Sequence, residues 1–274
     1  MRGRGTFLLV CTLVGIMFLV QPVVAQNYWM YPGEGTSVSL EVFKPKFEDW
    51  EGVELLTSVW LLSGRIKANE RIALMVDLPI SNADVDGSDW DETLLANPYI
   101  GGEFEIGPIN PKESFIARVG VRLPLASDDK YVASYVGMWT LYDRFEAFMP
   151  DLTTVIMGVG WSKALSDGVA EFEANVNGAY MFPGDGDSEL FGDYNIAVWF
   201  PVQTLKFGIG ASGRIIVSED DLDLGERTVH HARFAANLNT GSLKPGIQVQ
   251  IPLEEGLSDI VDYSYGVSLT YLIK

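Results

Sequence analysis

Apolar and polar residues alternate along several stretches of the chain, most clearly between residues 170 and 180. There every second residue is apolar or small, and the positions between them include Glu171, Glu173, Asn175 and Asn177. Side chains that alternate with a period of two point to opposite faces of a β-strand, whereas a helix repeats every 3.6 residues. The stretch therefore predicts a strand with one apolar and one strongly polar face. Soluble antiparallel sheets and membrane barrels both use such strands.

Twelve segments with this period follow one another along the chain. They span residues 35–44, 53–63, 70–79, 98–107, 114–125, 153–164, 169–181, 192–200, 204–217, 229–239, 243–252 and 263–273. The pattern does not decide which face of segment 53–63 points into the interior, because both of its faces are apolar.

The connections between these segments are alternately short and long. Those at 64–69, 108–113, 165–168 and 201–203 are short, whereas 126–152 and the other long ones carry most of the acidic residues. A sandwich with Greek-key connections has no reason to sort its loops in this way. An up-and-down outer-membrane barrel has short turns at its periplasmic end and long loops outside, and lipid forces its sheet to close. We therefore expect an all-β, antiparallel up-and-down transmembrane β-barrel of about twelve strands.

The longest connection contains large apolar residues at helical spacing. Steps of four and three residues separate Tyr131, Tyr135, Met138, Tyr142 and Phe145. We expect a helix in this extracellular loop, capped by Ser127 with Asp128 and Asp129 and ended by Pro150. Such a helix can gate the barrel mouth, plug the barrel or pack on its rim, and rim packing is the simplest arrangement. A strand over 131–142 is the alternative, since small and apolar residues also alternate there.

The first 25 residues have the features of a secretory signal peptide. Arg2 and Arg4 precede an apolar run at 7–20, and small residues at 23–25 form a cleavage site. The run is shorter than the roughly 20 residues that a membrane-spanning helix needs. We expect a signal peptide at 1–25 and one outer-membrane barrel domain at 26–274.

The composition of the chain limits the kinds of partner and cofactor that it can bind. The formal net charge is −18, which disfavours nucleic-acid binding. The one cysteine, Cys11, lies in the signal peptide, so the mature chain has neither a disulfide nor a thiolate metal site. The acidic segment 183–189 lacks the full pattern of a calcium loop. We expect no cofactor and no metal, and a monomer whose partners are outer-membrane lipid, a small-molecule solute and the barrel-assembly machinery during biogenesis.

The polar faces of the strands define a candidate channel lining. The residues expected to point into the lumen and to set selectivity are Arg71, Glu103, Glu105, Arg118, Arg122, Glu171, Glu173, Asn175, Arg214, His231 and Arg233. Counting from the turns sets Glu103 opposite Arg118 and Arg71 close to Glu105. These charges either hold the barrel in shape or select solutes by fixed charge and hydrogen bonding.

Catalysis has little support in the sequence. The only histidines, His230 and His231, are adjacent on one strand, so at most one faces the lumen. Ser212 is expected near His231, but no acid completes a hydrolytic triad, and we expect no catalytic residue. A membrane-embedded lipid hydrolase and a structural or adhesive barrel acting through its acidic loops are the alternatives to a channel.

Two stretches carry a family resemblance. They are Asn97 to Gly101, which leads into a strand, and Asp143 to Asp151, which closes the expected helix. With the signal peptide, they make the chain resemble the outer-membrane barrel proteins of the MetA-pathway phenol degradation-like family. The resemblance implies a channel or transporter for small, apolar or aromatic molecules, and it implies no catalytic residues.

Overall fold

The structure is a computed structural model that describes residues 35–48, 57–84, 91–106, 113–165, 168–219, 223 and 225–273. The expected signal peptide and residues 53–56 of the second expected strand lie outside the described residues. The strands are β1 (Thr36–Phe47), β2 (Ser58–Lys67), β3 (Ile72–Asp84), β4 (Asp91–Leu95), β5 (Tyr99–Glu105), β6 (Glu113–Arg122), β7 (Leu152–Leu165), β8 (Ala170–Pro183), β9 (Glu189–Val202), β10 (Leu205–Ile216), β11 (Thr228–Leu238), β12 (Leu243–Pro252) and β13 (Val261–Ile273). The helices are α2 (Tyr131–Thr140), the 3-10 helix η1 (Tyr142–Ala147) and α3 (Glu255–Ser258).

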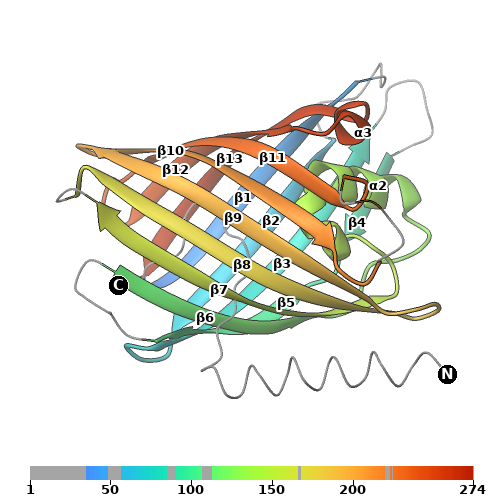
Figure 1. The fold of residues 1–274 in the computed structure, drawn as a ribbon, viewed down its shortest axis with the longest axis horizontal. Coiled ribbons are helices and arrows are strands. Elements are labelled where there is room, and N and C mark those ends of the chain that lie inside the picture. The colour runs from blue at the N-terminus through green and yellow to red at the C-terminus, as the bar shows by residue number, and fades with distance from the viewer. Residues whose placement is uncertain are drawn as a thin grey trace.

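The strands form one antiparallel sheet that closes on itself. Apart from β4 and β5, each strand pairs with its neighbour along the chain, and β1 also pairs with β13 (Figure 1). β4 and β5 both pair with β3 and are two parts of one strand. Asn97 and Pro98 separate them, and proline has no N–H to give to a ladder. With β4 and β5 counted as one strand, the barrel has twelve strands, as expected. Its closure leaves no sheet edge exposed.

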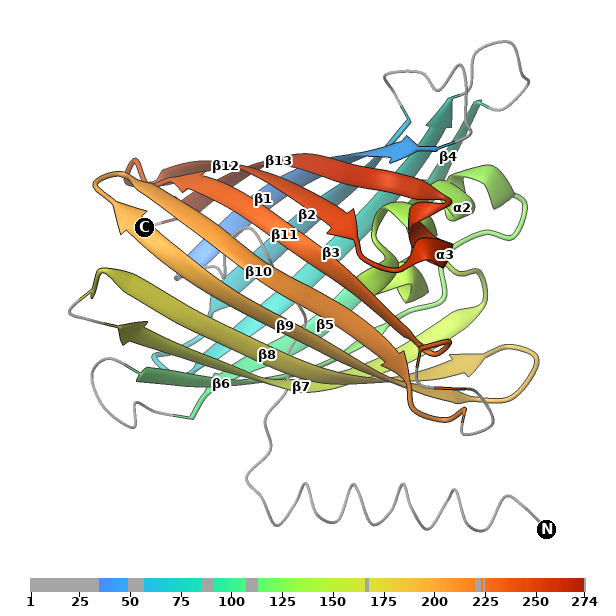
Figure 2. The same cartoon turned by 45° about the horizontal axis from the view of Figure 1, so that its top comes forward.

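The two ends of the barrel differ as the loop lengths predict. At one end Thr36 pairs with Ile273, and two-residue and four-residue turns join β9 to β10 and β11 to β12. The opposite end carries β4, α2 and α3 (Figures 1 and 2). The described parts of the long connections, including 123–151 and 253–260, lie at that end.

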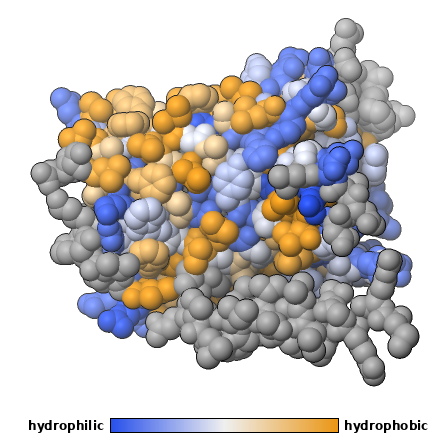
Figure 3. Space-filling view, viewed as in Figure 1, coloured by the Kyte–Doolittle hydropathy of each residue, from blue (hydrophilic) through white to orange (hydrophobic). Residues whose placement is uncertain are grey.

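The outer face of the strands is apolar. Val176, Ile247 and Val267 are each more than half exposed, although they are apolar, while their neighbours along each strand are buried. Figure 3 shows apolar side chains gathered over the strands and polar ones toward the end that carries α2. No helix among the described residues is long and apolar enough to cross a membrane.

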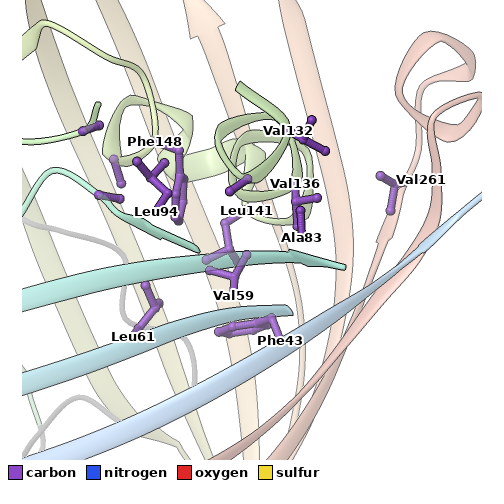
Figure 4. Close-up of a cluster of buried hydrophobic side chains, with 14 of the residues drawn as sticks. Phe43, Val59, Leu61, Ala83, Leu94, Val132, Val136, Leu141, Phe148 and Val261 are labelled. Carbon is purple, nitrogen blue, oxygen red and sulfur yellow. The ribbon is translucent and has the colours of Figure 1, made fainter. Parts of the chain in front are cut away.

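The connection between β6 and β7 folds into the barrel and does not pack on its rim. Val136 and Phe148 are fully buried against Val59 and Leu61 of β2 and Ala83 of β3 (Figure 4). The expected rim packing is therefore wrong, and the plug arrangement is observed. It also explains why both faces of β2 are apolar: one faces outward, and the other faces α2.

The helix differs from the prediction at both ends, because Ser127 does not cap it and α2 ends at Thr140, where Pro150 was the expected end. α2 begins after Lys130, and no side chain next to it in sequence caps it. Instead, Glu92 of β4 accepts hydrogen bonds from the N–H groups of Val132 (3.0 Å) and Ala133 (3.1 Å). A carboxylate at a helix N-terminus satisfies unpaired donors and the helix dipole. The cap comes from a distant strand, and the alternative strand over 131–142 is not formed.

Replacing Val176 by arginine tests which face meets lipid. Val176 is 54% exposed at the middle of β8. We expect Val176→Arg to lower the free energy of unfolding in lipid vesicles by about 2–4 kcal/mol, because the charge enters the middle of the bilayer. The control is Val202→Arg beside the β9–β10 turn, where Val202 is 52% exposed. There the cost near the interface is about 0–1 kcal/mol. Equal costs at the two positions contradict the assignment.

Candidate functional site

The interior of the barrel is occupied by the plug, which we define as residues 125–149 between β6 and β7. Asn97, at the break between β4 and β5, holds both ends of it. Its Nδ2 donates to the carbonyl oxygens of Glu146 (3.0 Å) and Met149 (2.7 Å). Its Oδ1 accepts from the N–H groups of Leu125 and Ala126, both at 2.8 Å. One buried amide therefore closes the base of the plug, and the strand has to break at Asn97 for its side chain to do so.

Glu146 joins the plug to two arginines of the barrel wall. Its carboxylate accepts from Arg122 Nε of β6 (3.2 Å) and from an Arg214 guanidinium nitrogen of β10 (2.8 Å). Arg214 also pairs with Asp193 of β9. All four side chains are buried. Breaking a buried ion pair leaves an uncompensated charge, so these contacts hold the plug in place.

Three further contacts attach the plug to the last strands. Asp143 accepts from Arg233 of β11 at 2.6 Å. The carbonyl oxygen of Thr140 accepts from Gln250 Nε2 of β12 at 2.5 Å and from Ser264 Oγ of β13 at 3.4 Å. The charged side of the plug therefore faces the wall opposite to β2 and β3, which hold its apolar side.

The two buried carboxyl groups of the plug, those of Asp143 and Glu146, are charged despite their burial. Burial raises the pKa of Asp143, but Arg233, Arg144 and His231 together lower it by more, and this pKa lies below its ordinary value of 3.8. Burial likewise raises the pKa of Glu146, but Arg214 and Arg122 together lower it by more, so that this pKa lies below 4.5. The contacts of the plug are consequently ion pairs at neutral pH.

An aromatic ladder runs along the plug. The ring centroids of successive members are 5.3 to 6.4 Å apart. Its members are Tyr131, Tyr135, Trp139, Tyr142, Phe145 and, on β9, Phe191. Tyr131 at the outer end is 69% exposed, whereas Phe191 is buried beneath Arg214. The ladder thus leads from the exposed mouth to the charged contacts.

Four of the ladder rings are among the helix residues singled out in the sequence. Met138, the fifth of those residues, packs against the apolar cluster instead. Trp139 and Phe191 extend the ladder and were not singled out. The step of four from Tyr135 to Trp139 was the available signal for one of them. No signal in the sequence marked Phe191 as a member of the ladder, because it lies on a distant strand.

Most residues expected in the lumen are buried on the inner wall. Those are Glu103, Arg118, Arg122, Glu173, Asn175, Arg214, His231 and Arg233. Glu171 is half-buried and pairs with Lys206 at 2.8 Å. Arg71 and Glu105 are exposed at the short-turn end, so the structure does not place them with the others.

The two expected pairings along the wall have different outcomes. Glu103 lies opposite Arg118 and pairs with it at 2.7 Å, so this prediction is confirmed. Arg65 also reaches Glu103, at 2.6 Å. Arg71 and Glu105 are close through their backbones, since the Glu105 N–H donates to the Arg71 carbonyl oxygen at 2.7 Å.

Sequence reasoning missed the plug side of the ion pairs. Asp143 and Glu146 lie in the last part of the expected helix, and no strand alternation marks them as interior. The available signal was that Asp143, Arg144 and Glu146 stand among large apolar residues. Among the described residues, no group of three His, Cys, Asp or Glu side chains is placed to hold a metal ion.

Several solved structures share this fold. The COG4313 outer membrane channel from Pseudomonas putida F1 has a TM-score of 0.60 at 11% identity, over 91% of this chain and 100% of that one. The NanC porin has a TM-score of 0.53 at 8% identity, over 87% and 100%. The KdgM porin has a TM-score of 0.51 at 9% identity, over 87% of this chain and 99% of that one. No protein-family model and no curated protein matches the chain.

At these identities the likeness concerns the fold. The chain has the twelve-stranded barrel of Gram-negative outer-membrane channels and porins, with a short helix between β6 and β7. The first of the three structures is a channel of the family that the sequence resembles, so the expected architecture is confirmed.

Removing the Asn97 amide tests its role at the base of the plug. We expect Asn97→Ala to lower the free energy of unfolding by about 2–5 kcal/mol, because it leaves several buried backbone groups without partners. The measurement is urea-induced unfolding in lipid vesicles. The exposed Asn239 is the matched control, and Asn239→Ala should stay within about 0.5 kcal/mol of the wild type. Equal small effects would show that Asn97 does not hold the plug.

Acid should loosen the plug. Carboxyl groups with a lowered pKa contribute stability that is complete above their ordinary pKa and is lost as pH falls through the lowered value. Hydrogen exchange of the amides at 131–147, corrected for the intrinsic rate, should be constant from about pH 7 to 5 and faster below about pH 4. Strand β12 serves as the internal reference. Faster exchange on raising the pH instead would contradict this assignment of the charges.

Proposed function

We propose that the protein is an outer-membrane channel for small molecules and that the plug closes it in the observed state. The observation that carries this proposal is that the wall of the barrel and the segment that obstructs it are separate parts of the structure. The barrel is complete without the plug, because β6 pairs directly with β7 and the sheet closes through β1 and β13. The obstruction is one connection, held by side-chain contacts that can break while the ladder hydrogen bonds remain.

The chemistry of the attachment also favours a movable plug. A purely structural filling of the barrel would gain most from apolar packing, since buried ion pairs are often no better than apolar residues of the same volume. The side of the plug that faces Arg122, Arg214 and Arg233 is instead held by carboxylates. Ion pairs are directional contacts that have two distinct states, paired and separated, as a gate requires.

For the solute, we propose a small molecule with a flat apolar face. The aromatic ladder supports this choice, because it offers successive ring faces from the exposed Tyr131 to the partly buried Phe145. Stacked or tilted rings bind other flat apolar groups favourably. The arginines of the inner wall, Arg118 among them, are the proposed fixed charges that select among solutes. The channel acts as a monomer in outer-membrane lipid.

A reversible tether tests the movement of the plug. Thr140 ends α2, and its carbonyl oxygen is 3.4 Å from Ser264 Oγ of β13. We expect the double variant Thr140→Cys, Ser264→Cys to conduct ions in a planar bilayer when reduced and to stay closed when oxidised. The reason is that a disulfide between these residues fixes the plug to the wall.

The single variant Ser264→Cys is the control, and its conductance should not respond to oxidant. Equal conductance of the oxidised and reduced double variant would contradict a movable plug. Absence of conductance in the wild-type protein and in both variants would contradict the channel itself.

A further inference from the structure

Four polar residues lie side by side on the inner face of four neighbouring strands, β8 to β11. Asn175 is paired with Asn195, Asn195 with Ser212, and Ser212 with His231. We call these four residues the polar row. Side chains that are directly opposed on adjacent strands share one face of the sheet. The row is therefore a continuous patch on the barrel wall.

Each member of the polar row is buried and has a polar atom without a partner. The side chains are 0% to 4% exposed. Within the part of the chain that the structure describes, the atoms without a hydrogen bond are Asn175 Oδ1, Asn195 Oδ1, Ser212 Oγ and His231 Nδ1. Buried polar groups nearly always have a partner, since an unmet one costs free energy. Four such atoms in a row point to a binding role, because folding alone is better served by apolar residues.

The polar row lies where a solute would pass the plug. Arg214 and Arg233, which hold the plug carboxylates, are the next inward-facing residues after Ser212 and His231 on the same strands. Because β10 and β11 are antiparallel, Arg214 lies on one side of the row along the barrel and Arg233 on the other, so a solute that passes both contacts meets the row between them.

We propose that the polar row is a binding subsite for a small neutral solute that carries several hydroxyl groups. This inference rests on the proposed channel function and adds hydroxyl groups to the flat apolar face of the proposed solute. Erythritol, which has the hydroxyl groups without such a face, is the probe for the contacts with the row alone. Amide oxygens only accept hydrogen bonds, and a serine oxygen and a neutral imidazole nitrogen can accept them as well. The row therefore calls for a ligand that donates several hydrogen bonds.

The neighbouring charges favour a neutral solute over an ion. The positive charges of Arg214 and Arg233 disfavour a cation. Asp193 pairs with Arg214, and Asp143 pairs with Arg233, so an anion would have to displace a carboxylate. A neutral hydroxylated molecule avoids both costs and supplies the missing donors.

Erythritol flux into proteoliposomes, divided by the potassium chloride conductance of the same preparation, measures the row directly. We expect the double variant Asn195→Leu, Ser212→Ala to lower this ratio by about fivefold or more, since each lost hydrogen bond weakens binding by roughly that factor. Ser268→Ala is the control. Ser268 is a buried serine of β13, outside the row, and its variant should keep the wild-type ratio.

A second readout separates binding from a structural role. Asn195→Leu removes a buried amide oxygen that has no partner, so the temperature of unfolding should fall little, if at all, while the flux ratio falls. An unchanged ratio with normal conductance overturns the inference and leaves the channel in place. A lower unfolding temperature with an unchanged ratio also overturns it. A wild-type protein that neither conducts nor takes up erythritol overturns the channel, and the inference with it.

Discussion

A carboxylate inside a barrel must be paired with a cation, and the plug is arranged around this requirement. Glu146 lies between Arg122 and Arg214, which come from strands on different sides of the barrel. Removing one partner would leave a buried charge whose cost is several kcal/mol, about 3–5 in measured cases. The backbone of η1 is thereby fixed relative to the wall. Asn97 closes the base of the plug through the carbonyl oxygen of Glu146 itself.

The two sides of the plug are held by different physical forces. α2 packs apolar residues against β1 to β3, where the hydrophobic effect acts without direction. η1 offers carboxylates to β6, β10 and β11, where geometry matters. A segment held in this way can leave the charged side while it stays attached to the apolar side. The ion pairs therefore set the position of the plug, and the apolar cluster retains it.

Much of the fold follows from local patterns. Alternation placed the strands, loop lengths placed the ends, and counting from a turn placed Glu103 opposite Arg118. The position of the plug could not be predicted from local patterns, because it depends on contacts between residues far apart in sequence. Glu92 caps α2 from 40 positions away in the sequence, and Arg233 pairs with Asp143 from 90 positions away. The apolar inner face of β2 was visible in the sequence as an ambiguity, and only the buried helix gives its reason.

The open probability of single channels tests the central claim most directly. The variant Asp143→Asn, Glu146→Gln keeps the shape of the plug and removes both of its paired carboxylates. A channel closed by these ion pairs should be open more often in the variant than in the wild type, at the same single-channel conductance. If the two proteins open equally often while the barrel of the variant remains folded, the ion pairs do not hold the channel closed.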